Sequence, residues 1–258
     1  MRKSAQATAF ILIGALIIAS FLILTTAKKE TAPKLETEME KVQIDDSNVR
    51  AFVQSCVDTT AKNAVFYLGF VGGNLKNDVF PQFFTHDSYY RIPYYYYEGN
   101  SFILSEDGFK KLVLAAYMNE NLRKCTNNFR AFENIRIVDS APKTIVDMSD
   151  SEVIFSVDYP VSINRGFKAK NLDRNYISNV KARLREIINI AQTIVQNEVV
   201  NDRYIHWDYM TDVSNKNYNI TTYTEDDSTI IYRIIDLENE IEKEPYIFQF
   251  ANKIKVNK

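Results

Sequence analysis

The sequence predicts an α+β fold, in which an N-terminal transmembrane helix precedes an extracytoplasmic domain of helices and mostly antiparallel sheets. One observation is an uncharged apolar run over residues 7–27, bounded by Arg2-Lys3 and Lys28-Lys29, which is long enough to span a bilayer as a helix. The other is that helix-spaced apolar patterns and β-branched runs occur in separate groups along the rest of the chain. Such segregation is typical of α+β folds with antiparallel sheets.

The apolar run predicts a transmembrane helix over residues 6–27, because lipid forces every backbone polar group to be satisfied within the segment. A secretory signal peptide is the competing interpretation, with a shorter apolar stretch and a small-residue cleavage site after it. Here the stretch is longer and continues into Thr25-Thr26-Ala27-Lys28, which favours a retained anchor. The charges at the two ends do not fix the orientation, but a short basic N-terminus usually stays in the cytoplasm. We therefore expect a single-pass protein of the cell membrane with its C-terminal domain outside the cytoplasm.

Residues 28–46 are charged and poor in large apolar side chains, and Pro33 should interrupt any helix that continues from the membrane. We interpret this segment as a juxtamembrane spacer that precedes a domain over residues 47–258. A change of pattern near residues 131–134 is a candidate sub-boundary of that domain. The net charge of −2 does not indicate a nucleic-acid partner.

The domain should open with a helix that begins at Asp46 or Ser47, since either side chain can cap it. Its apolar residues keep helical spacing, and Gly69 or the Gly72-Gly73 pair should end it. The members of this stripe are Val49, Phe52, Val53, Cys56, Val57, Ala61, Ala64, Val65 and Leu68. A second helix should run from Ser105 to Lys124.

Between these helices, Tyr89–Tyr97 and Ser101–Leu104, joined by Glu98-Gly99-Asn100, predict a β-hairpin. Four consecutive tyrosines, Tyr94, Tyr95, Tyr96 and Tyr97, place rings on both faces of its first strand. Either the strand is buried on both sides, or one row of rings forms an interface with a glycan, a peptide or another subunit.

The second half of the domain should contain most of the strands. Ile135–Val138, Thr144–Met148 and Val153–Tyr159 predict an antiparallel meander that ends at Pro160. A long helix is expected from Asp173 to Val199, with Ile177 and Val180 on its apolar face. Four further strands should then complete the chain, at Ile205–Met210, Tyr218–Tyr223, Thr229–Ile235 and Tyr246–Phe250.

Two cysteines, Cys56 and Cys125, lie in or at the end of predicted helices. In an extracytoplasmic domain a single disulfide is the natural interpretation, and two buried free thiols are the alternative. A loop of this size would stabilise the fold by roughly 4 kcal/mol in the chain-entropy model.

The sequence offers no convincing catalytic residues, cofactor site or metal site, and we expect a protein that is not an enzyme. His86 and His206 are the only histidines, and the cysteines lack the close spacing of zinc ligands. His206 and Asp208 could share one face of a strand, but a solvent-facing pair with Trp207 buried explains that segment equally well. A surface hydrolase that uses scattered residues stays open as the least favoured function.

Three other segments have a structural and a functional interpretation. Gly69-Phe70-Val71-Gly72-Gly73 lacks the Lys and Ser/Thr of a P-loop, so its glycines more simply end a helix. Glu225-Asp226-Asp227 could attract Ca²⁺, but it lacks the spacing of a known calcium loop, and a solvated turn is favoured. Asn219-Ile220-Thr221 is an acceptor triplet for N-glycosylation at Asn219.

The N-terminus, Lys3-Ser4-Ala5-Gln6 followed at once by the apolar run, resembles the class III signal peptide of archaeal type IV pilins and archaellins. The resemblance implies cleavage between Ala5 and Gln6, loss of a leader over residues 1–5, and retention of the whole apolar helix. Ser4 stands where that family usually has a basic residue, and the early helix lacks the Glu of many pilins. The resemblance therefore supports the sorting route more than filament assembly.

A wider resemblance covers most of the chain. It depends on Phe52–Cys56, Leu68–Gly73, Val157–Pro160 and Pro245–Ala251, which are similar to segments of uncharacterised archaeal membrane-anchored proteins. It implies a location at the cell surface and carries no known activity.

These observations predict a structural or interaction protein at the archaeal cell surface, anchored in the lipid bilayer and pilin-like in its sorting. Self-assembly through the N-terminal helix, or contact with an envelope protein or glycan, would supply its partners. A surface module that binds a glycan or peptide is the alternative.

Overall fold

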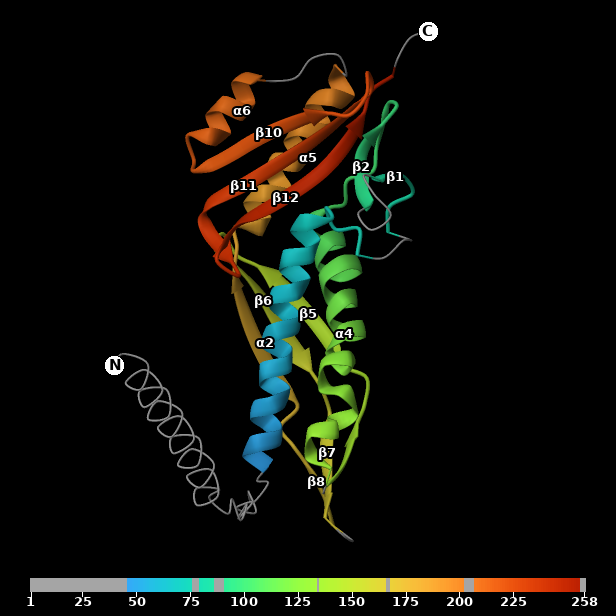
Figure 1. Ribbon diagram of the computed structural model, residues 1–258, viewed down its shortest axis with the longest axis vertical. Helices are drawn as coiled ribbons and strands as arrows, with labels where there is room; N and C mark the ends of the chain where they lie inside the picture. The colour runs from blue at the N-terminus through green and yellow to red at the C-terminus, as the bar shows by residue number, and fades with distance from the viewer. Residues whose placement is uncertain are drawn as a thin grey trace, which may run out of the picture. The chain divides into compact units, whose positions relative to one another are not determined.

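The computed structural model describes residues 46–75, 79–85, 91–133, 135–165, 168–201 and 207–255. These residues belong to one compact unit, Asp46–Lys258, with an α+β fold and mostly antiparallel sheets (Figure 1). The predicted leader, the predicted transmembrane helix and residues 28–45 of the predicted spacer lie outside the described residues. Within the described ranges, no helix is both long enough and apolar enough to cross a bilayer.

Helix α2 (Asp46–Phe70) begins where the sequence predicts and buries most of the expected apolar stripe. It lies beside α4 (Ala116–Thr126), as Figure 1 shows. The predicted second helix is confirmed as three consecutive parts, and Ser105 caps it because its Oγ accepts a hydrogen bond from the Gly108 N–H at 3.1 Å. These parts are α3 (Glu106–Gly108), the π-helix η1 (Phe109–Ala115) and α4, and a 3₁₀ segment, η2 (Asn127–Phe132), follows.

The two cysteines join α2 to α4. Cys56 and Cys125 lie at disulfide distance, with 2.15 Å between their Sγ atoms and 5.6 Å between their Cα atoms. The predicted pairing is therefore present in the structure, and the alternative of two free thiols is not.

A six-stranded sheet contains the hairpin and the C-terminal strands, in the order β1-β2-β12-β11-β10, with β3 paired to β2. Strands β2 and β12 are parallel, and the other pairs are antiparallel. The last three strands confirm the prediction and extend beyond it. The bounds are β1 (Phe83–Thr85), β2 (Arg91–Tyr97), β3 (Asn100–Ser101), β10 (Tyr218–Thr224), β11 (Thr229–Ile241) and β12 (Glu244–Lys253).

The predicted meander of three consecutive strands is wrong in part, because its strands belong to two separate three-stranded antiparallel sheets. One has the order β4-β7-β8 and the other β5-β6-β9. Strands β5 and β6 pair as expected, but β4 pairs with β7, which lies beyond Pro160. Strand propensity does not select partners, which tertiary packing decides. The bounds are β4 (Arg136–Asp139), β5 (Lys143–Met148), β6 (Glu152–Asp158), β7 (Val161–Arg165), β8 (Lys168–Asn171) and β9 (Asn175–Lys181).

The predicted helix from Asp173 to Val199 is wrong in its first part. Only α5 (Leu184–Val200) is helical, and the residues before it form β9. Ile177 and Val180 fit a helical stripe in the sequence, but strand alternation buries Val180 and leaves Ile177 62% exposed. The segment is rich in residues that favour strands, and its full-length pairing with β6 decides between the two structures.

The predicted strand from Ile205 to Met210 is also wrong. Residues Trp207–Ser214 form helix α6, and residues 205–206 lie outside the described part of the chain. The buried positions of α6 are Met210 and Val213, three residues apart, as expected for a helix that covers another element on one side.

Candidate functional site

The segment His206-Trp207-Asp208 does not have the strand geometry on which its catalytic interpretation depended. His206 and His86 lie outside the described residues. Trp207 and Asp208 begin α6, and Trp207, which we expected to be buried, is 56% exposed.

The tyrosine run on β2 points mostly into the protein. Tyr94, Tyr95 and Tyr96 are buried within the domain, and only Tyr97 is partly exposed. The Tyr95 ring stacks on Phe250 with 4.8 Å between centroids, and its hydroxyl donates to the Gly72 carbonyl oxygen at 2.9 Å. The interpretation of a strand buried on both sides is therefore correct for these three residues, so they do not offer the predicted interface.

The glycines after α2 have a structural role. Gly72 and Gly73 have φ values of +56° and +77°, which end the helix in the left-handed region. A Cβ on Gly69 would lie 2.2 Å from the Ile247 carbonyl oxygen, so glycine allows α2 to contact β12 closely. This supports the helix-end interpretation of the segment.

The acidic triplet lies in the turn between β10 and β11. The Asp226 carboxylate accepts hydrogen bonds from the N–H groups of Ser228 and Thr229, both at 2.7 Å, and from their hydroxyls. These bonds, led by those from Ser228, lower the pKa of Asp226. The described residues contain no cluster of three or more His, Cys, Asp or Glu that could hold a metal ion, and the triplet is a turn.

Asn219 of the glycosylation triplet is exposed on β10, at one edge of the six-stranded sheet. Its register partner on β11 is Ile235. The side chain is thus accessible, while the triplet as a whole lies within a regular strand.

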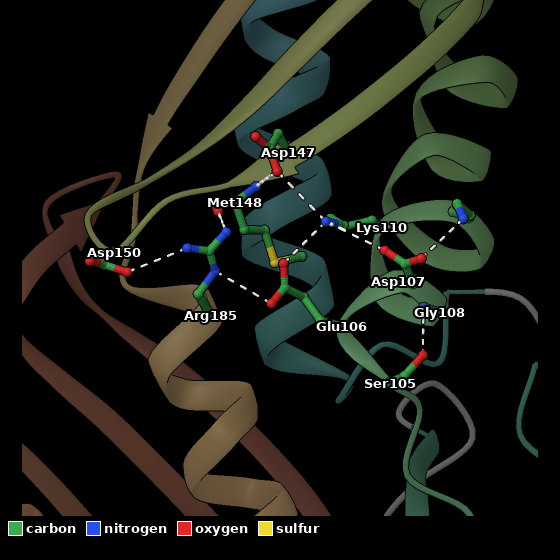
Figure 2. A network of polar contacts seen from close by, with 10 residues as sticks. Ser105, Glu106, Asp107, Gly108, Lys110, Asp147, Met148, Asp150 and Arg185 are labelled. Atoms are coloured by element: carbon green, nitrogen blue, oxygen red, sulfur yellow. Dashed lines mark hydrogen bonds and ion pairs between the residues drawn. The ribbon is translucent and has the colours of Figure 1, made fainter.

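A polar cluster that sequence reasoning missed joins the start of η1 to the β5–β6 turn and to α5 (Figure 2). The Lys110 side chain is 17% exposed, and its ammonium lies 3.1 Å from Glu106, 3.5 Å from Asp107 and 3.6 Å from Asp147. The hydrogen bond with Glu106 is the main cause of a raised pKa at Lys110.

Arg185 continues this cluster from α5. Its guanidinium lies 3.4 Å from both Glu106 and Asp150, and it donates to the Met148 carbonyl oxygen. π-Helical turns often occur at functional sites, but here each carboxylate faces a cation. The ion pairs connect three segments that are distant in the sequence. We therefore assign the cluster a role in stability.

The largest of the described cavities is a groove between α5 and α6, with a volume of about 520 Å³. Its floor contains Ile190 and Val213, which are both buried. Its rim contains Glu186, Asn189, Thr193, Tyr209, Asp212 and Lys216. An apolar floor with a few polar groups around it is typical of small-ligand sites, and the volume is within their usual range.

Two of the rim groups are already held in place. Glu186 accepts a hydrogen bond from the Tyr218 hydroxyl at 2.9 Å, and the Lys216 ammonium lies 4.0 Å from the Glu186 carboxylate. Asn189 and Asp212 are exposed. Together with the Tyr209 ring, such amide and carboxylate groups can bind the hydroxyls of a sugar or the backbone of a short peptide.

Among the residues that the structure describes, the most deeply buried charged groups, Glu198 and Asp236, lie at the six-stranded sheet and not in this groove. The Glu198 carboxylate accepts hydrogen bonds from Tyr232 at 2.5 Å and from Asn252 at 2.8 Å. Asp236 is fully buried and accepts bonds from Arg183 at 3.2 Å. Both carboxylates are satisfied, and they connect the sheet to α5 and to the segment that precedes it.

The groove could have been found only in part from the sequence. Residues 186, 189, 190 and 193 have the i, i+3, i+4, i+7 spacing of one helical face, as do residues 209, 212, 213 and 216. The second face was hidden because the segment was predicted to be a strand, and the approach of two helices to each other is a tertiary feature.

Comparison with known proteins provides no relative: no family model, no curated protein and no solved structure matches this chain.

Proposed function

We propose that this chain is a single-pass membrane-anchored protein whose domain acts outside the cytoplasm as a structural or interaction protein of an archaeal cell surface. The observation that carries the proposal is the uncharged run over residues 7–27 with basic residues at both ends. The Ala5–Gln6 bond before it has the position of a class III cleavage site, which supports a pilin-like sorting route.

The paired cysteines give independent support for the location. Disulfides form and persist in oxidising environments and are rare in the cytosol of mesophiles. Cys56 and Cys125 lie at bonding distance between two core helices, as expected for a domain that is exported and then oxidised.

Mass spectrometry of the native protein, extracted from membranes, tests the proposal. We expect a mature N-terminus at Gln6, and cysteines that alkylate only after reduction. Release of the protein by carbonate without detergent would contradict the anchor. Retention of Met1 would contradict the pilin-like processing and, with it, assembly through the helix.

The α5–α6 groove favours a second candidate, a surface module that binds a glycan or a short peptide. Isothermal titration of the full chain in detergent with envelope-derived oligosaccharides and peptides tests this candidate. Asp212→Ala should weaken binding at least tenfold, because the carboxylate lies on the groove rim. Asp208→Ala, an exposed acid on the same helix outside the groove, is the matched control and should bind normally.

A further inference from the structure

The rim of the α5–α6 groove carries one negative charge that has no counter-ion. Its charged groups are Glu186, Asp212 and Lys216. The Glu186 carboxylate faces the Lys216 ammonium and also accepts the hydrogen bond from Tyr218. Asp212 is exposed and forms no ion pair or hydrogen bond with the residues that the structure describes. The groove is therefore suited to a ligand that brings a positive charge to Asp212.

Tyr209 stands beside this carboxylate. Tyr209 and Asp212 both line the groove and lie three residues apart on α6, so their side chains are neighbours on one face of the helix. A tyrosine ring attracts a cation to its face, and a carboxylate forms strong hydrogen bonds with an ammonium group. The two side chains together offer a site for an ammonium.

The rest of the groove matches what a lysine residue would add to that ammonium. Ile190 and Val213 form a buried apolar floor, and a lysine packs its alkyl stem on apolar surface while its charged head stays in a polar site. The Asn189 side chain is exposed and makes no hydrogen bond with the described residues. An amide of this kind can both donate to and accept from a peptide backbone.

We propose that the α5–α6 groove binds a lysine side chain of a short peptide, with its ammonium between the Asp212 carboxylate and the Tyr209 ring. The alkyl stem lies over Ile190 and Val213, and Asn189 pairs with the peptide backbone. The inference rests on the second candidate function, a surface binding module, and names its ligand. Charge complementarity favours this ligand over a neutral glycan, because withdrawing the Asp212 carboxylate from water is costly unless the ligand supplies a cation.

Binding of two blocked alanine pentapeptides to the full chain in detergent tests the proposal. One peptide has lysine at its centre, and the other has norleucine, which has the same stem without the ammonium. Isothermal titration gives the dissociation constants. Trp207, the only tryptophan of the chain, begins α6 and is 56% exposed, so its fluorescence provides a second readout beside the groove.

We expect the lysine peptide to bind at least tenfold more tightly than the norleucine peptide. Asp212→Asn should weaken binding of the lysine peptide about tenfold and leave the weaker binding of the norleucine peptide unchanged, because it removes only the charge pair. Tyr209→Leu should weaken binding of the lysine peptide about threefold, whereas Tyr209→Phe keeps the ring and should bind normally. Asp208→Asn, at an exposed acid of α6 that does not line the groove, is the matched control and should also bind normally.

Equal affinity for the two peptides would overturn the recognition of lysine, although the groove would still bind peptide. Binding of an envelope oligosaccharide that depends on Asp212, with no binding of either peptide, would overturn it too and would identify a glycan module. If neither peptide nor oligosaccharide binds to chain with a native circular dichroism spectrum, both the inference and the binding module are contradicted. The membrane anchor is tested separately, by the mass spectrometry described above.

Discussion

The six-stranded sheet and the β5-β6-β9 sheet differ in how many of their faces are covered. The central strands of the first contact both α5 and the end of α2, and β12 has a run of buried residues from Phe248 to Asn252, so both of its faces are covered there. The second packs one face on α2 and leaves the other open, so β9 alternates regularly between exposed and buried residues. The number of covered faces, more than strand propensity, therefore sets the pattern of apolar and polar residues along a strand.

The largest effect expected from this difference is at Phe250, at the centre of the covered sheet. Its ring is fully buried and stacks on Tyr95 at 4.8 Å and on Tyr232 at 5.1 Å. Phe250→Ala should reduce the free energy of unfolding by about 4 kcal/mol, because it leaves a cavity between two fixed rings. Urea unfolding followed by circular dichroism measures the change. A loss below about 1 kcal/mol would show that the Phe250 ring is not packed between the two tyrosine rings.

The second largest effect should come from the loss of an ion pair, which is buried at one sheet and exposed at the other. Arg183 is 12% exposed and pairs with fully buried Asp236 beneath the covered sheet. Arg183→Met should cost about 3 kcal/mol, since it leaves a buried carboxylate without its cation.

The matched variant is Arg174→Met at the edge of the open sheet. Arg174 pairs with Asp158, but both side chains are solvent-accessible, so the loss should be less than about 1 kcal/mol. Equal losses in the two variants, measured by the same unfolding experiment, would contradict the assignment of a buried pair to one sheet and a surface pair to the other.

Removal of a buried tyrosine hydroxyl should also change the free energy of unfolding differently in the two sheets, by a smaller amount. Tyr232 donates to the buried Glu198 carboxylate, and Tyr232→Phe should cost about 2 kcal/mol, as expected for a hydrogen bond to a charged group. The Tyr176 hydroxyl, on β9, is buried without a hydrogen-bond partner in the described residues. Tyr176→Phe should therefore be neutral or stabilising, and a loss as large as that of Tyr232→Phe would contradict the contrast.

The covered sheet should also respond to acid through Asp236. Burial would raise the pKa of Asp236, but hydrogen bonds from Arg183, the Glu238 N–H and Asn239 lower it below its usual value. A lowered folded-state pKa stabilises the fold above about pH 4 and loses that contribution as the pH falls through the folded value. The stability difference between the native chain and Asp236→Asn should therefore shrink below about pH 4. A difference that grows on acidification would mean that Asp236 is not held as a carboxylate.

Elements with long regular patterns could be predicted from the sequence. The stripe of α2 runs from Val49 to Leu68, about five turns, and the three C-terminal strands are rich in β-branched or aromatic residues, so both were identified. The burial of Tyr94, Tyr95 and Tyr96 was left open, because a run of amphipathic rings fits an interface as well as a covered strand. Whether a strand is covered on both faces depends on elements that are distant in the sequence. The local sequence pattern does not contain this information.

The wrong predictions concern short segments whose apolar residues fit both the spacing of a helix and the alternation of a strand. Ile177 and Val180 are three residues apart, as in a helix, but only Val180 faces the core. Trp207, Met210 and Val213 share helical spacing, which was hidden by a strand assignment based on aromatic and β-branched residues. The α5–α6 groove depends on that helix, so it was missed with it. Strand pairing and burial in the folded domain, and not the intrinsic propensity of the residues, decided between helix and strand in these segments.

The smallest effect should come from the open face of the β5-β6-β9 sheet. Ile145 and Ile177 are 75% and 62% exposed, and both are register partners of Ser156. Ile145→Ala and Ile177→Ala should each change the free energy of unfolding by less than about 0.5 kcal/mol, because little apolar area is withdrawn from water at either site. Val153→Ala, on the covered face of the same sheet, is the matched control and should cost about 2 kcal/mol. If the isoleucine variants lose as much as Val153→Ala, this face is covered in the native protein, and a partner or a second copy of the chain must supply the cover.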